Sequence, residues 1–151
     1  LCGILERHLN MDKDINKQKE RIAKVFPKGI EDIFKSSGTL EIYREFLKSK
    51  LDNPVNMTGI EDFDWEEFYV LGPGSQKEYE KLKKTRPSYT DIYILESIDD
   101  EYDEHFGLIA NVIRECDKKL FQIPLADLKA LDKNTKNYQL LDDYSVWCVN
   151  Y

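Results

Sequence analysis

The sequence predicts a single α+β domain, in which N-terminal helices precede a small antiparallel barrel or a strongly bent sheet. Three observations support this prediction. The 151 residues match the size of one domain. About 41% of them are hydrophobic, which is enough for a core even though 34% are charged. After Pro54, the apolar pattern changes from helical spacing to short extended segments.

The first 25 residues are predicted to form a loosely attached helical arm. Residues 12–21 carry a single apolar side chain, Ile15, so a helix there has almost no face to bury. The chain starts at Leu1 and a methionine follows at Met11. We therefore expect residues 1–10 to be an expression-vector remnant or a processed leader, and we exclude them from functional argument.

Two amphipathic helices are expected next. The first starts near Phe26, has Pro27 in its first turn and stops at Gly38. The second has Thr39 as its N-cap and ends before Pro54. Its apolar stripe should dock on the core and consists of Leu40, Tyr43, Leu47 and Leu51.

Five short segments after Pro54 have the β-branched and aromatic composition of strands. They are Val55 to Thr58, Trp65 to Leu71, Asp91 to Ile98, Phe106 to Arg114 and Lys119 to Ile123. The third is apolar on both faces, which predicts a place near the middle of the sheet. The last two are separated by a short polar connection and should pair antiparallel.

Two further helices are predicted in the second half of the chain. Ser75 begins a capping box, and the helix that it starts should end near Thr85. In the C-terminal segment, Tyr144, Trp147 and Cys148 follow helical spacing, which favours a terminal helix over a strand.

Charge and composition exclude several classes of function. The 22 Lys and Arg residues against 29 Asp and Glu residues give a net charge of −7, which repels nucleic acid and anionic membranes. The three cysteines lack the even, dense pattern of a disulfide-rich secreted domain, so we expect a reducing, cytoplasmic setting. His8 and His105 stand in no recognisable catalytic pattern, so the protein is not expected to be an enzyme.

The strongest local signal is a run of carboxylates between two predicted strands. It consists of Asp99, Asp100, Glu101, Asp103 and Glu104. Like charges this close repel one another, and calcium or a cationic partner surface would relieve the repulsion. The run is not an EF-hand, because Glu104 stands where that loop needs glycine. It is predicted to be a solvated hairpin tip, a calcium site or a contact with a partner.

A second acidic cluster alternates with aromatic residues. If the segment is extended, Phe63 and Trp65 point inward, and Asp62, Asp64 and Glu66 point outward along one face. Three aligned carboxylates could share a cation. They are equally the solvent side of an edge strand that resists aggregation.

The C-terminal part of the chain resembles a known family. The stretch from Ile123 through Pro124, Leu125 and Leu128, followed by Asp143, Tyr144 and Trp147, resembles the C-terminal pattern of small cyanobacterial calcium-binding proteins. The helix running into Pro54 resembles the same family, so the likeness spans roughly residues 43–147. It implies an α+β domain with an SH3-like sheet and acidic calcium sites.

Two functions follow as hypotheses. The first is a non-catalytic, acidic calcium-binding protein. The alternative is a protein-interaction module, of an immunity or regulatory type, that presents an acidic surface to a basic protein. A calcium-dependent change in stability would favour the first, and tight, salt-sensitive association with a basic protein would favour the second.

Overall fold

The computed structural model describes residues 2–30 and 32–151, and for residues 2–10 it describes the backbone alone. The prediction that residues 1–10 are an expression-vector remnant or a processed leader concerns residues whose side chains lie outside the described part of the chain. The helices are α1 Cys2–Val25, α2 Ser37–Lys50, α3 Glu67–Val70, α4 Gln76–Leu82 and α5 Lys136–Asn150, with 3-10 turns η1 Asp64–Glu66 and η2 Leu125–Asp127. The strands are β1 Asn56–Gly59, β2 Tyr93–Asp103, β3 Gly107–Arg114, β4 Leu120–Pro124 and β5 Leu128–Ala130.

The five strands form one antiparallel sheet with the order β4-β3-β2-β1-β5. This arrangement confirms the α+β class, the central place of β2 and the antiparallel pairing of β3 with β4. The two edge strands, β4 and β5, are not partners in the described sheet, so it stays open. A small antiparallel barrel or a strongly bent sheet was predicted. The barrel is not confirmed, because the sheet is open, and its long strand β2 is interrupted by register shifts against β3.

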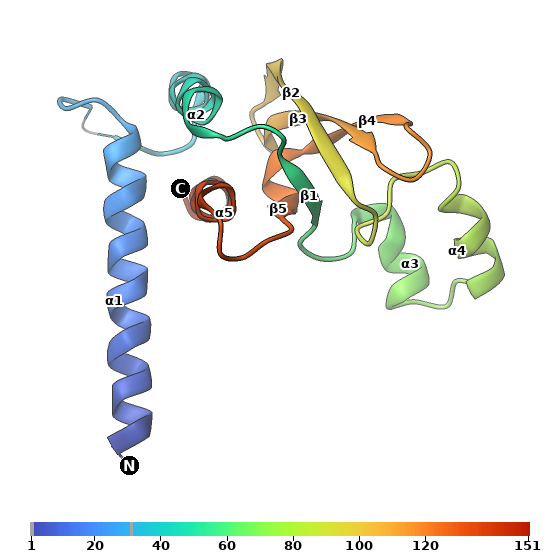
Figure 1. Ribbon diagram of the computed structural model, residues 1–151, viewed down its shortest axis with the longest axis horizontal. Helices are drawn as coiled ribbons and strands as arrows, with labels where there is room; N and C mark the ends of the chain where they lie inside the picture. The colour runs from blue at the N-terminus through green and yellow to red at the C-terminus, as the bar shows by residue number, and fades with distance from the viewer. Residues whose placement is uncertain (1, 31) are drawn as a thin grey trace.

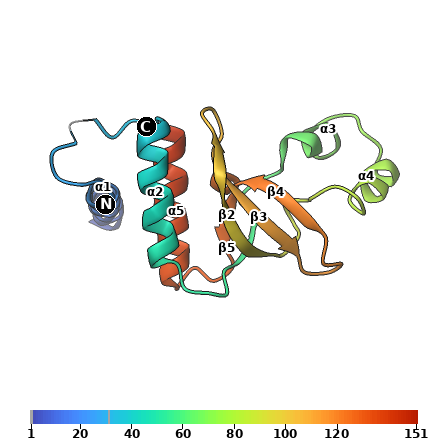
Figure 2. The ribbon, with the colours of Figure 1, turned by 90° about the horizontal axis from the view of Figure 1, so that it is seen from above.

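The elements are arranged in layers (Figures 1 and 2). Helices α2 and α5 run side by side against the sheet, and α1 crosses on their outer side. Its N-terminal half projects away from the rest of the molecule (Figure 1). Helices α3 and α4, which lie between β1 and β2 in the chain, extend beyond the opposite side of the sheet (Figure 2).

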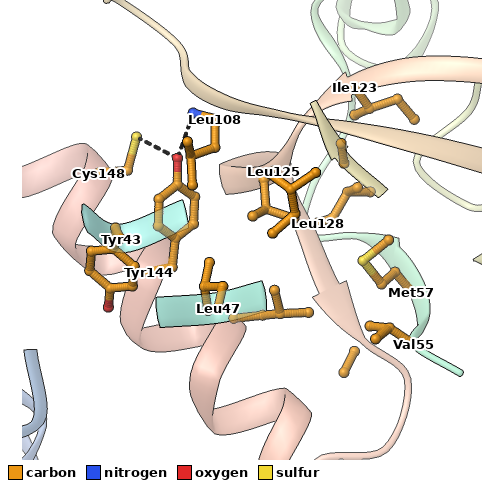
Figure 3. Packing of buried hydrophobic residues seen from close by; sticks show 14 of the residues in the cluster. Tyr43, Leu47, Val55, Met57, Leu108, Ile123, Leu125, Leu128, Tyr144 and Cys148 are labelled. Atoms are coloured by element: carbon orange, nitrogen blue, oxygen red, sulfur yellow. Dashed lines mark hydrogen bonds between the residues drawn. The ribbon is translucent and has the colours of Figure 1, made fainter. Parts of the chain in front are cut away.

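The core lies between the sheet and the α2 and α5 pair, and Figure 3 shows part of it. The hydroxyl of Tyr144 accepts a hydrogen bond from the backbone N–H of Leu108 at 2.8 Å and donates one to Sγ of Cys148 at 3.6 Å. Gly107 has a φ of 81°, and a Cβ there would lie 2.6 Å from the Tyr144 hydroxyl oxygen. The β2–β3 hairpin can therefore close over α5 only with glycine at this position.

The arm is one continuous helix, and its last turns are attached to the body. Ile22 is completely buried, and the Arg21 guanidinium binds the buried Asp143 carboxylate of α5 at 2.8 Å. The sequence pattern of residues 12–21 does not indicate this attachment. The anchoring residues are Arg21, the last residue of that stretch, and Ile22, which follows it. Residues 11–17 are exposed, as the pattern predicts.

The helix predicted from Phe26 to Gly38 is wrong. Residues 26–30 and 32–36 form turns and irregular backbone, with Gly29 at a φ of 99°. The predicted second helix is confirmed as α2. Its N-cap is Ser36, and Thr39 completes a capping box as the third residue of the helix, so the predicted cap was three residues too late.

The predicted strand from Trp65 to Leu71 is also wrong, because these residues form most of η1 and all of α3. The fifth strand of the sheet is instead β5, which has only three residues. Ser75 caps α4 as predicted, and the terminal helix is confirmed as α5. Strand β2 continues to Asp103, so the first acidic run lies mostly within a strand and not in a loop.

Candidate functional site

The first acidic run contributes two carboxylates to the architecture of the hairpin. Asp99 accepts hydrogen bonds from the side-chain amides of Asn111 and Gln122, at 3.0 and 3.2 Å, and from the backbone N–H of Glu101 at 2.8 Å. These donors lower the pKa of Asp99 below its ordinary value, with the Asn111 bond the largest cause. Together with Asp100, Asp99 borders a groove between the end of α2 and β2.

Asp103 holds the turn that follows β2. Its carboxylate accepts the backbone N–H groups of Phe106 at 2.8 Å and His105 at 2.7 Å, and these bonds lower its pKa. Asp100, Glu101 and Glu104 are exposed. No three of the five carboxylates of this run, all of which the structure describes, are arranged to hold a metal ion.

Glu66 does not point outward with Asp62 and Asp64 as predicted. It is completely buried, and its carboxylate accepts four hydrogen bonds. The donors are the backbone N–H groups of Phe63 at 3.3 Å and Tyr89 at 2.8 Å, and the hydroxyls of Ser88 at 2.8 Å and Tyr79 at 2.5 Å. The helical path of η1 and α3 turns this side chain inward, where it joins α3 and α4 to residues 88–89.

Asp62 and Asp64 border a groove of about 420 Å³ with three further carboxylates. The loop after β1, η1 and the start of α3 form one wall, and η2 and the last turns of α5 form the other. The five acidic residues, hereafter the groove carboxylates, are Glu61, Asp62, Asp64, Glu67 and Asp127. No basic residue borders the groove within the described part of the chain.

The carboxyl of Asp127 is affected both by the groove wall and by two neighbouring groove carboxylates. The residue as a whole is exposed, but the groove wall partly withdraws its carboxyl from water. This desolvation raises its pKa, and repulsion from Asp64 and Glu61 raises it further. The backbone N–H of Ile60 donates to the Asp127 carbonyl at 2.9 Å, which holds the two walls together.

The sequence provides no signal that Asp127 lies beside the other groove carboxylates. Asp127 is an isolated acid between apolar residues, more than 60 positions from Asp64, and only the β1–β5 pairing brings the two segments together. Glu61 and Glu67 flank the second acidic cluster in the sequence but were not among the residues predicted to share a cation.

Among the residues that the structure describes, no group of three or more His, Cys, Asp or Glu side chains is arranged to hold a metal ion. The groove carboxylates stand apart around an open hollow. A small cation would therefore have to draw them together. Of the described cysteines, Cys116 is exposed and Cys148 is buried, and neither is in a disulfide.

Comparison of the chain with family models, with curated proteins and with solved structures finds no match. The resemblance to calcium-binding proteins thus stays a prediction from residues 43–147. No helix in the described residues has both the length and the apolar character needed to cross a bilayer.

Proposed function

We propose that this protein is a non-catalytic binding protein and that its groove carboxylates bind calcium. The observation that carries the proposal is that, among the residues the structure describes, five carboxylates and no basic residue border one groove. There desolvation, and then repulsion from Asp64 and Glu61, raise the pKa of Asp127. A cation in the groove would relieve this repulsion, and the relief would appear as binding energy.

The chemistry of the groove favours calcium over other divalent cations. Calcium takes roughly six to eight oxygen ligands in a flexible shell, whereas magnesium requires a compact octahedron and gives up its waters reluctantly. Carboxylates that approach from two walls of an open hollow suit the first ion better. The resemblance of Ile123 to Trp147 to calcium-binding proteins, with its implied SH3-like sheet, also supports this ion.

The test is thermal unfolding with calcium, with magnesium and at matched ionic strength. At a calcium concentration of 100 times the dissociation constant, linkage adds about 2.7 kcal/mol to the free energy of unfolding. Calcium should raise the Tm more than magnesium does. The double variant Asp64→Asn with Asp127→Asn should lose the calcium response and should stay folded, because both residues are exposed.

A matched control removes the same two charges from the hairpin. Glu101→Gln with Glu104→Gln changes two exposed carboxylates and should keep the full calcium response. If the hairpin variant loses the response and the groove variant keeps it, calcium binds at the first acidic run instead. If millimolar calcium adds nothing to the effect of ionic strength, the calcium function is wrong.

A second candidate function is docking of a basic protein, as in the alternative hypothesis. It is favoured by a separate observation, since exposed apolar side chains border the same groove.

A further inference from the structure

The groove has an apolar part that calcium would not use. Ile60, Leu71 and Val149 border it and are 43%, 80% and 75% exposed. They come from the loop after β1, the end of α3 and the last turn of α5, so three separate segments place apolar surface at one hollow. Single exposed apolar residues are ordinary, but a group of them around a concave site marks a binding surface.

The charges around this apolar part have one sign and no partners in the structure. None of the groove carboxylates takes part in an ion pair within the described residues. Elsewhere on the molecule, acidic side chains such as Asp117 and Asp143 are paired with arginine. The groove therefore presents unneutralised negative charge beside water-exposed apolar surface.

These two properties define one kind of occupant. A segment with Lys or Arg on one side would meet the carboxylates, and bulky apolar side chains between them would cover Leu71 and Val149. Nucleic acid and a second negatively charged surface would be repelled. A hollow of about 420 Å³ has room for side chains of a peptide, far more than a single ion fills.

We propose that the groove is a docking site for a basic, amphipathic segment of another protein. The apolar residues provide the contact area, and the carboxylates select the charge and orient the segment. This proposal rests on the second candidate function, for which it names the site and the kind of segment bound. It does not depend on calcium binding, because the apolar residues have no role in holding a cation.

The experiment uses two synthetic helical peptides of equal length and equal Lys content. One carries Leu on the face opposite the Lys residues, and the other carries Ser there. We expect the Lys–Leu peptide to bind in a calorimetric titration and to weaken as salt is added. The Lys–Ser peptide should bind at least about tenfold more weakly, because burial of the apolar anchors dominates such contacts.

Two variants separate the apolar part from the charge. Leu71→Ser with Val149→Ser should weaken binding of the Lys–Leu peptide about tenfold or more. It should leave any calcium response unchanged, so failure of this proposal and failure of the calcium proposal are distinguishable. Asp64→Asn with Glu67→Gln should weaken binding and flatten its salt dependence.

The charge-matched control is again Glu101→Gln with Glu104→Gln, which should keep the affinity of the wild-type protein within about twofold. Circular dichroism and the Tm check that each variant folds. Equal binding of both peptides, or equal weakening by the control, would reduce the interaction to non-specific charge attraction and overturn the proposal. Self-association of the protein that the Leu71 and Val149 changes abolish would assign the groove to a second copy and would also overturn it.

Discussion

Four aromatic side chains meet where α2, α5 and the segment after α1 converge. Trp147 is completely buried, with ring centroids 4.8 Å from Tyr43, 5.7 Å from Phe26 and 6.0 Å from Tyr144. Its indole N–H donates to the carbonyl of Ile33 at 2.7 Å. One residue thus fixes both the helix layer and the irregular segment that links α1 to α2.

We expect Trp147→Ala to reduce the free energy of unfolding by about 3 to 5 kcal/mol, as for other large-to-small changes in cores. Trp147→Phe keeps most of the ring contacts and loses the hydrogen bond to Ile33, so it should cost less. Chemical denaturation of both variants measures the difference. A cost below about 1 kcal/mol for the alanine variant would contradict the packing described.

Two aspartates should respond to pH with opposite signs. The pKa of Asp127 is raised, so its contribution to stability is present below its unfolded pKa and is lost as pH rises through its folded pKa. Asp127→Asn should therefore be more stable than wild type at pH 7, and the gain should vanish in acid. The bond to Arg114 lowers the pKa of Asp117 to about 2.

Asp117 accordingly stabilises the fold above its unfolded pKa of about 4, and this contribution is lost as pH falls through about 2. Asp117→Asn should be less stable than wild type at neutral pH and should approach it near pH 2. Denaturation at several pH values measures both variants. The sign assignment fails if both shift stability in the same direction at pH 7.

At the scale of elements, predictions from sequence succeeded where one pattern decides the structure. The apolar stripe of α2 and the β-branched and aromatic composition of residues 106–114, which contain β3, each predicted an element that has a buried face. The segment from Trp65 to Leu71 carries a strand-like composition, but the four hydrogen bonds to Glu66 favour the helical path. Strand β5 has three residues, too few for a periodic signal, and it forms because β1 supplies a partner.

Among the described side chains of helix α1, those of residues 11–17 are exposed, whereas Ile22 is buried. Removing residues 1–16 should shift the Tm by no more than about 3 °C, the change that roughly 1 kcal/mol causes in a domain of this size. Removing residues 1–25 should cost more, because Ile22 leaves the core and Asp143 loses Arg21. Thermal unfolding of the two truncated chains measures this, and equal Tm values would show that the attachment contributes nothing.

At the scale of the whole molecule, the acidic clusters predicted a cationic ligand but could not place it. Both acidic clusters are visible in the sequence, yet only Asp62 and Asp64 of the predicted residues reach the groove. The remainder of the groove depends on contacts between distant segments. The pairing of β1 with β5 places Asp127 at the groove, and the packing of α5 places Val149 there. No local sequence pattern contains that information.

Two buried ionic groups organise the segment between β1 and β2. Glu66 holds parts of the segment to one another. Arg114 of β3 holds the segment to the sheet, because its guanidinium binds Asp91 and Asp117 and donates to the carbonyls of residues 83, 84 and 86. Only Phe63 and Tyr79 in residues 60–86 are buried apolar side chains. The segment is therefore a candidate to detach as one cooperative unit while the sheet stays folded. Helix α3 forms part of one wall of the groove. The groove is therefore complete only while this segment stays attached, and the fraction of molecules with the segment detached would be the fraction that lacks the groove.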